Sequence, residues 1–246
     1  MDRMLYVAMT GARETLRAQT ANNHNLANVS TTGFRADLQA FQARQVTGDG
    51  YGSRVYATAA TTGFDATVGA MMSTGRDLDV AVQGSGYLAV EGPDGREAYT
   101  RAGDLRIDSS GQLRTGTGLA VLGEAGPVSV PPHASVLIAG DGTISIVPLG
   151  QGPETKAEVG RIKLVNPANQ DLEKRPDGLF RMKDGSDAPP DAATSLASGV
   201  LESSNVNVAD AMVNMIELSR RFDMQVRAMK SAEDNGAASA RLLSQR

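Results

Sequence analysis

The sequence predicts an α+β protein in which long N- and C-terminal helices form a coiled-coil-like assembly domain around a central all-β domain of short antiparallel strands. Two observations support this fold class. Apolar residues recur at heptad spacing near both ends, and turn signals recur throughout the middle. The predicted segments are an N-terminal helical assembly segment (1–44), an extended or hairpin connector (45–75), the central β domain (76–195) and a C-terminal helical assembly segment (196–246).

The first helix is expected from Arg3 to Ser30, where the recurring positions alternate between spacings of three and four residues. Such spacing forms a coiled-coil seam, the stripe of a helix that faces a partner helix. Gly33 follows the pattern and suits the left-handed backbone conformation that commonly ends a helix. The seam positions are Leu5, Met9, Ala12, Leu16, Gln19, Asn23, Leu26 and Ser30.

The second helix is expected from about residue 206 to about residue 243, and Asn205 or Asn207 can cap its start. At 1.5 Å per residue it would be about 57 Å long. Helices of compact domains average about 11–12 residues, so this length is unusual for such a domain. Its seam positions are Val208, Met212, Met215, Phe222, Val226, Met229, Gly236, Ala240 and Leu243.

Between the helices, glycine-containing turn signals separate short stretches rich in β-branched residues or with alternating polarity, which is typical of an antiparallel β domain. The turn signals are Pro93–Gly95, Ser109–Gly111, Gly126–Pro127, Asp141–Gly142, Pro176–Gly178 and Asp184–Gly185. The expected strands are Leu78–Val82, Tyr87–Val90, Val136–Ile138, Ile144–Val147 and Arg161–Val165.

The composition argues against most catalytic chemistry. Cysteine is absent and the histidines are His24 and His133, so disulfides, thiolate metal sites and multi-histidine metal centres cannot form within one chain. The net charge is −4 and the middle of the chain is acidic, which argues against a nucleic-acid partner. No nucleophile elbow, metalloprotease helix or phosphate-binding loop is present in the sequence. We therefore expect no enzyme activity, no catalytic residue, no cofactor and no metal.

No segment has the length and polarity of a membrane span or a secretory signal. The longest apolar run near the start is Met4 to Met9. A signal peptide needs about 7–15 apolar residues and a transmembrane helix about 20. We expect no membrane insertion, and if the chain leaves the cytoplasm we expect a route without a cleavable signal peptide.

Two arrangements of the terminal helices are open. They could pack on each other or on the sheet within one molecule, or they could assemble between subunits. Gln19, Asn23 and Ser30 place polar groups in the N-terminal seam. Polar seam residues reduce stability but select register and partner, so the pattern favours assembly between subunits.

Several long motifs resemble those of the bacterial flagellar rod and hook family, in the same order and over nearly the whole chain. One departure is His24, where the family usually has the first Asn of an Asn-Asn-Leu-Ala-Asn run. The matching stretches are Asn25–Arg35, Leu78–Tyr87, Tyr99–Leu105, Gly118–Gly123, Leu201–Asn207 and Met212–Glu217.

The resemblance implies a structural subunit of the flagellar rod, the drive shaft that transmits motor torque across the periplasm. It also implies helical assembly with itself and with proximal and distal rod subunits, after export by the flagellar type III apparatus. The opening residues and the length are most similar to a proximal rod subunit. A distal rod or hook-type axial subunit is the first alternative. A flagellum-associated cell-wall enzyme is a weaker one, because no paired carboxylate or nucleophile–base set was found.

We expect the assembly interface to combine a hydrophobic seam with register-setting asparagines. Asn23, Asn25 and Asn28 would form the hydrogen bonds and Asn205 the helix cap. The expected hydrophobic residues are Leu5, Met9, Leu16, Leu26, Met212, Met215, Phe222, Val226 and Met229.

Overall fold

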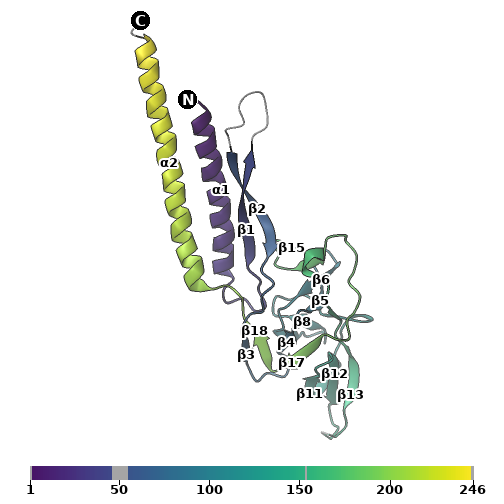
Figure 1. Cartoon of the computed structure of the whole chain (residues 1–246). Coiled ribbons are helices and arrows are strands. Elements are labelled where there is room, and N and C mark those ends of the chain that lie inside the picture. The colour runs from purple at the N-terminus through teal and green to yellow at the C-terminus, as the bar shows by residue number, and fades with distance from the viewer. Residues whose placement is uncertain (1, 46–54, 153, 245–246) are drawn as a thin grey trace. The chain divides into compact units, whose positions relative to one another are not determined.

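A computed structural model describes residues 2–45, 55–152 and 154–244. The chain forms two compact units, which we describe separately (Figure 1). The helical unit comprises Met1–Asn28, Asp37–Phe64 and Val206–Arg246, and the β unit comprises Val29–Ala36 and Asp65–Asn205. The mixed α+β composition is observed, with many short antiparallel strands.

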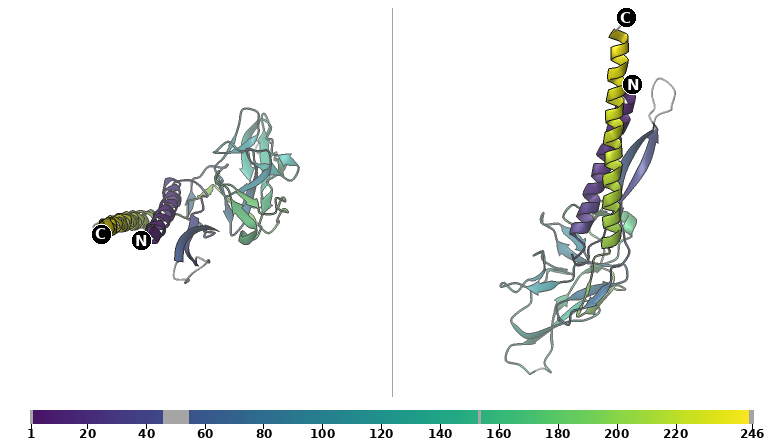
Figure 2. Two further views of the ribbon diagram at one scale, coloured as in Figure 1. Left: turned by 90° about the horizontal axis from the view of Figure 1, so that it is seen from above. Right: turned by 90° about the vertical axis from the view of Figure 1, so that its left-hand side faces the viewer.

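The helical unit contains two helices and a β-hairpin. Helix α1 (Asp2–Ala27) contacts both α2 (Val208–Ser244) and the hairpin of β1 (Asp37–Gln45) and β2 (Val55–Phe64). Figures 1 and 2 show α1 beside each of them. The two strands pair antiparallel from Asp37 opposite Phe64 to Gln45 opposite Val55, with a register shift after Leu38. Part of the predicted connector (45–75) lies outside the described residues.

One continuous stripe of α2, with heptad spacing, is buried or half-buried. Of its predicted seam, Met215, Phe222, Met229 and Gly236 belong to this stripe, whereas Met212 is 52% exposed. The side chain of Leu243 lies outside those described. The buried and half-buried positions at alternating spacings of four and three are Ala211, Met215, Leu218, Phe222, Gln225, Met229, Ala232, Gly236 and Ser239.

Small residues of α1 allow the two helices to approach closely. A side chain at Gly11 would begin 2.9 Å from the Gln225 amide nitrogen. Near the other end of α1, the Asn22 side chain donates a hydrogen bond to the carbonyl of Ala211, at 2.8 Å. The helix pair is therefore formed within one chain.

The expectation that the terminal helices alone form a coiled-coil-like domain is wrong. The two helices pack against each other in the same chain, and a β-hairpin completes their unit. The buried apolar residues of α1 are alanines 8, 12 and 18, whereas the larger seam residues Leu5, Met9 and Leu16 are exposed. At its fully buried apolar positions, α1 therefore carries alanine instead of the large interlocking side chains that a coiled coil needs on both helices.

The β unit is built from short antiparallel strands in small sheets. A five-stranded sheet has the order β14-β5-β6-β16-β15 and a three-stranded sheet the order β11-β12-β13, while two-stranded ribbons complete the unit. The strands are β3 (Met71–Ser73), β4 (Val80–Gln83), β5 (Tyr87–Glu91), β6 (Glu97–Thr100), β7 (Leu105–Ile107), β8 (Leu113–Thr115), β9 (Leu122–Gly123), β10 (Gly126–Pro127), β11 (His133–Ile138), β12 (Thr143–Pro148), β13 (Ala157–Arg161), β14 (Leu164–Val165), β15 (Leu172–Lys174), β16 (Phe180–Met182), β17 (Ser195–Ser198) and β18 (Val200–Glu202), with a 3₁₀ turn at Asn169–Asp171.

One hydrophobic core joins these sheets. Val80, Leu88, Leu105, Ile144 and Ile162 come from different parts of the unit, and each is at most 1% exposed. A two-stranded ribbon is marginally stable alone in water. The common core therefore stabilises strands that are too short to be stable as isolated pairs.

Candidate assembly surface and the junction

The motifs Asn25–Arg35 and Leu201–Asn207 meet in the β unit, at what we call the junction: residues 33–36, 65–70, 101 and 202–205. Gly33 has a positive φ of 67° and its N–H donates to the Glu202 carbonyl at 2.8 Å. A side chain there would begin 2.3 Å from the carbonyl carbon of Arg101. Glycine is therefore required at this position by both conformation and space.

A buried ion cluster lies at the centre of the junction. The Glu202 carboxylate is 2.6 Å from Nη1 of Arg35 and 2.7 Å from Nε of Arg101, and the three side chains are at most 2% exposed. Arg101 also donates to the carbonyls of Gly86 and Val82. Burial lowers the pKa of Arg101, and the Glu202 carboxylate opposes this effect. The cluster joins segments from both ends of the sequence inside the β unit.

Asn205 holds the junction together instead of capping α2. Its Oδ1 accepts the Ala36 N–H at 2.8 Å, and its Nδ2 donates to the carbonyls of Asp65 and Thr67. The cap is formed by Asn207, whose Oδ1 accepts the Ala209 N–H at 2.9 Å. Of the two cap candidates in the sequence, the structure therefore assigns Asn207.

The asparagines at the end of α1 bond within the helical unit. Asn25 binds the backbone of Asp37 twice, since its Oδ1 accepts the N–H at 2.8 Å and its Nδ2 donates to the carbonyl at 3.0 Å. Asn28 donates to the carbonyl of His24 at 2.9 Å. Asn23 is exposed. Asn25 thus attaches the start of β1 to the last turn of α1.

Large apolar side chains are exposed on both helices, and we call these the helix faces. Their exposed fractions range from 37% at Leu5 to 71% at Leu242. Large contiguous patches of exposed apolar side chains mark protein–protein contact surfaces, so we treat the helix faces as a candidate assembly surface. The helix faces consist of Met4, Leu5, Tyr6, Met9 and Leu16 on α1, and Val208, Met212, Val213, Ile216, Met224, Val226 and Leu242 on α2.

The predicted hydrophobic interface residues divide between the helix faces and half-buried positions. Leu26, Met215, Phe222 and Met229 are half-buried. Those that lie on the helix faces are Leu5, Met9, Leu16, Met212 and Val226.

Sequence reasoning missed part of both sites. Val213, Ile216 and Met224 lie outside the heptad seam, and the signal that could have found them is a second apolar stripe beside it. Arg35 and Glu202 were also missed, although each is a charged residue inside a recognisable motif.

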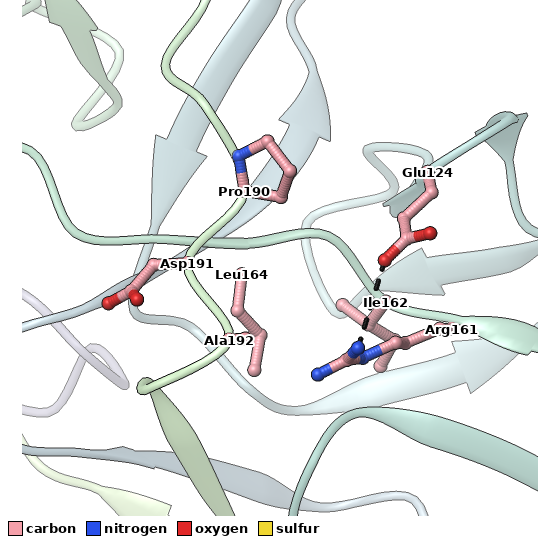
Figure 3. Close-up of a pocket in the computed structure, with 7 residues that line it drawn as sticks. All are labelled: Glu124, Arg161, Ile162, Leu164, Pro190, Asp191 and Ala192. Atoms are coloured by element: carbon pink, nitrogen blue, oxygen red, sulfur yellow. Dashed lines mark ion pairs between the residues drawn. The ribbon is translucent and has the colours of Figure 1, made fainter.

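One pocket of the β unit is small for chemistry on a small molecule. A pocket of about 120 Å³ is bordered by Glu124, Arg161, Pro190 and Asp191 (Figure 3). Binding sites for small molecules usually measure about 300–1,000 Å³. Hydrogen bonds from the Ala193 N–H and from a neighbouring hydroxyl lower the pKa of the Asp191 carboxyl. The Asp191 carboxylate therefore stabilises the turn that follows it in the chain.

Within residues 2–45, 55–152 and 154–244, no three potential metal-ligating side chains form a cluster. Neither α1 nor α2 combines the length and apolar character needed to cross a bilayer, judged on their described residues.

Comparison with known proteins places these features in one family. Residues 197–242 match the model described as "Flagellar basal body rod FlgEFG protein C-terminal", and residues 81–146 match "Flagellar hook protein FlgE/F/G D1 domain". The chain is 45% identical to the flagellar basal-body rod protein FlgF of Escherichia coli over 250 residues, which cover 99% of both chains. The corresponding protein of Salmonella typhimurium is 43% identical over 99% of both.

The similarity extends to a second kind of rod protein. The flagellar basal-body rod protein FlgG of Bacillus subtilis is 32% identical, covering 95% of this chain and 96% of its own. The chain belongs to the flagellar basal-body rod protein family.

Proposed function

We propose that this protein is a structural subunit of the flagellar rod and assembles with other axial subunits in the basal body. The chain matches flagellar rod proteins over 99% of its own length and 99% of theirs. The family is structural, not enzymatic. One observation links this function to particular residues: the large apolar side chains of the helix faces are exposed to solvent in the isolated chain.

In the rod, we propose, the helix faces are buried against neighbouring subunits. Full burial of a Leu or Met side chain contributes about 1.5–3 kcal/mol. Met212, Ile216 and Met224 point out of the helix pair and can supply this energy without disturbing it. Phe222 and Met229 would contribute to the assembly only indirectly, by stabilising the helical unit, because they lie on the half-buried stripe of α2.

The finer details of partners and location are also proposals. We infer that the neighbours are further copies and the proximal and distal rod subunits, and that the flagellar type III apparatus exports the chain to the periplasm. Head-to-tail contacts between identical subunits generate helical assemblies when rotation does not close a ring. Such an assembly, fixed by many repeated contacts, can transmit torque without slipping.

Replacing Ile216 with Asp tests the proposal. Ile216 is 55% exposed, so the variant chain should fold normally, which circular dichroism and thermal unfolding would verify. Burying the carboxylate in an assembly would cost several kcal/mol, repeated in every subunit. We expect a deletion strain expressing Ile216→Asp to be non-motile and to lack hooks.

The matched control is Asn214→Asp, which adds the same charge at an exposed polar position of the same helix. It should restore swimming to the deletion strain. Normal swimming with Ile216→Asp, or equal loss with both variants, would contradict the proposed role of the helix faces.

A further inference from the structure

A short segment of the β unit presents apolar side chains to solvent. We call residues 66–72, which lead into β3, the β3 strip; apart from Gly69 they are all exposed. Val68 is 49% exposed, Met71 44% and Met72 52%. Successive side chains of a strand point to opposite faces, so Met71 and Met72 leave both faces of β3 uncovered. Within the described part of the chain, the strand that pairs with β3 is β18 (Figure 1).

The backbone of the β3 strip is nevertheless fixed in place. The Gly69 N–H donates to the Glu202 carboxylate at 2.9 Å. The next carbonyl, that of Ala70, accepts the Ser203 N–H at 2.8 Å. A surface that is already held in one conformation loses little freedom when a partner covers it, and this favours binding. The β3 strip is therefore a pre-organised apolar surface.

The two units of the chain differ in the sign of their net charge at pH 7, counting histidine as neutral. The helical unit has 11 basic and 9 acidic side chains, a net charge of +2, whereas the β unit has 13 basic and 19 acidic ones, a net charge of −6. Contact between like units of two copies brings like charges together, which is unfavourable. Contact between the helical unit of one copy and the β unit of another brings opposite charges together, so the charges favour this arrangement.

Building on the function proposed above, we propose that the β3 strip is the surface on which the helix faces of a second copy dock. Contacts in a helical assembly are heterologous, which means that a patch of one subunit meets a different patch of the next. The β3 strip is such a patch, since it is apolar, fixed and part of the unit of opposite charge. Both surfaces also contain exposed methionines, whose flexible side chains fill irregular gaps.

Thiol labelling tests whether the β3 strip is covered, because the chain contains no cysteine of its own. Met72→Cys and Ala70→Cys would each be produced as monomer and in basal bodies of a deletion strain. Ala70→Cys adds only a sulfur atom at an exposed position, so it should fold and assemble even if Met72→Cys does not. We expect maleimide to label both at least about tenfold more slowly in basal bodies than in the monomer, because the core of a protein interface excludes solvent. Ser109→Cys, at an exposed turn of the β unit, should show no such change.

Photo-crosslinking identifies what covers the strip. Met72 would be replaced by the photoreactive amino acid p-benzoylphenylalanine, and isolated basal bodies would be irradiated. We expect a covalent product of twice the mass of the chain, in which peptide mapping finds residue 72 joined to α1 or α2. A crosslink within one chain, to the β unit of a second copy or to a different rod protein would overturn the proposal.

Met224→Cys, on the helix face of α2, separates this proposal from the function on which it rests. Protection of Met224→Cys in basal bodies, together with equal labelling of the strip cysteines in monomer and basal bodies, would overturn docking on the β3 strip and leave the proposed function intact. Absence of protection at Met224→Cys would contradict the proposed role of the helix faces themselves.

Discussion

At the residue scale, Gly33 shows how a motif position can be required for a reason that its neighbours in the sequence do not reveal. The sequence pattern interpreted Gly33 as a helix end, but α1 ends at Ala27. The glycine instead brings its backbone against Arg101 and bonds the carbonyl of Glu202. These partners are distant in the chain, so local spacing could not have predicted them.

Replacing Gly33 with Ala should destabilise the β unit more than the same change at Gly95. Both glycines have φ near 70°, but a side chain at Gly95 meets nothing within 4 Å. Gly95→Ala therefore isolates the conformational cost, about 1–2 kcal/mol. Gly33→Ala adds a clash with backbone, and we expect at least about twice that loss in urea unfolding. Equal losses would show that the close approach to Arg101 is unimportant.

At the scale of elements, the heptad patterns predicted both helices but not what they contact. Helix α2 carries its buried stripe and its exposed apolar residues side by side, so periodicity alone cannot decide which stripe meets α1. On α1, Gly11 lies where any side chain would meet Gln225, and a glycine contributes no apolar side chain to a pattern. Alanine and glycine permit close packing, but heptad analysis favours larger residues.

Strand β1 illustrates a second reason for a missed element, since the extended or hairpin connector was expected only from residue 45. Strand β1 is rich in Gln and Ala and contains Arg44, residues with little intrinsic strand preference. Its extended form depends on pairing with β2 and on the Asn25 bonds to Asp37. Such support comes from the tertiary structure and leaves no periodic signal in the sequence.

The contact of Gly11 with Gln225 gives a test of the helix pair. Gly11→Leu should push the helices apart and lower the thermal midpoint and helicity of the chain, since the added side chain meets the Gln225 amide. Shortening that partner with Gln225→Ala should recover part of the loss in the double variant. Additive losses in the double variant would mean that the two residues do not meet.

At the scale of the whole molecule, the chain passes between its two units at four places. At three of them, the last residue on the β-unit side belongs to the junction. Ala36, Asp65 and Asn205 stand at these passages and are linked by hydrogen bonds inside the β unit. Ala36 and Asn205 are 169 residues apart in the sequence. The order helix, strands, helix could be predicted, but a helical unit made of three separate segments could not, because its basis is long-range hydrogen bonding.

The absence of cysteine provides a direct test of whether the helix faces are buried in the rod. Met224→Cys, at a position 61% exposed, would be compared with Ser109→Cys, at an exposed turn of the β unit. Both variants must first support swimming. Maleimide labelling would then be measured on the monomer and on isolated basal bodies. We predict rapid labelling of both monomers, and at least about tenfold slower labelling of Met224→Cys, but not of Ser109→Cys, in basal bodies. Equal labelling of Met224→Cys in the two states would contradict assembly through the helix faces.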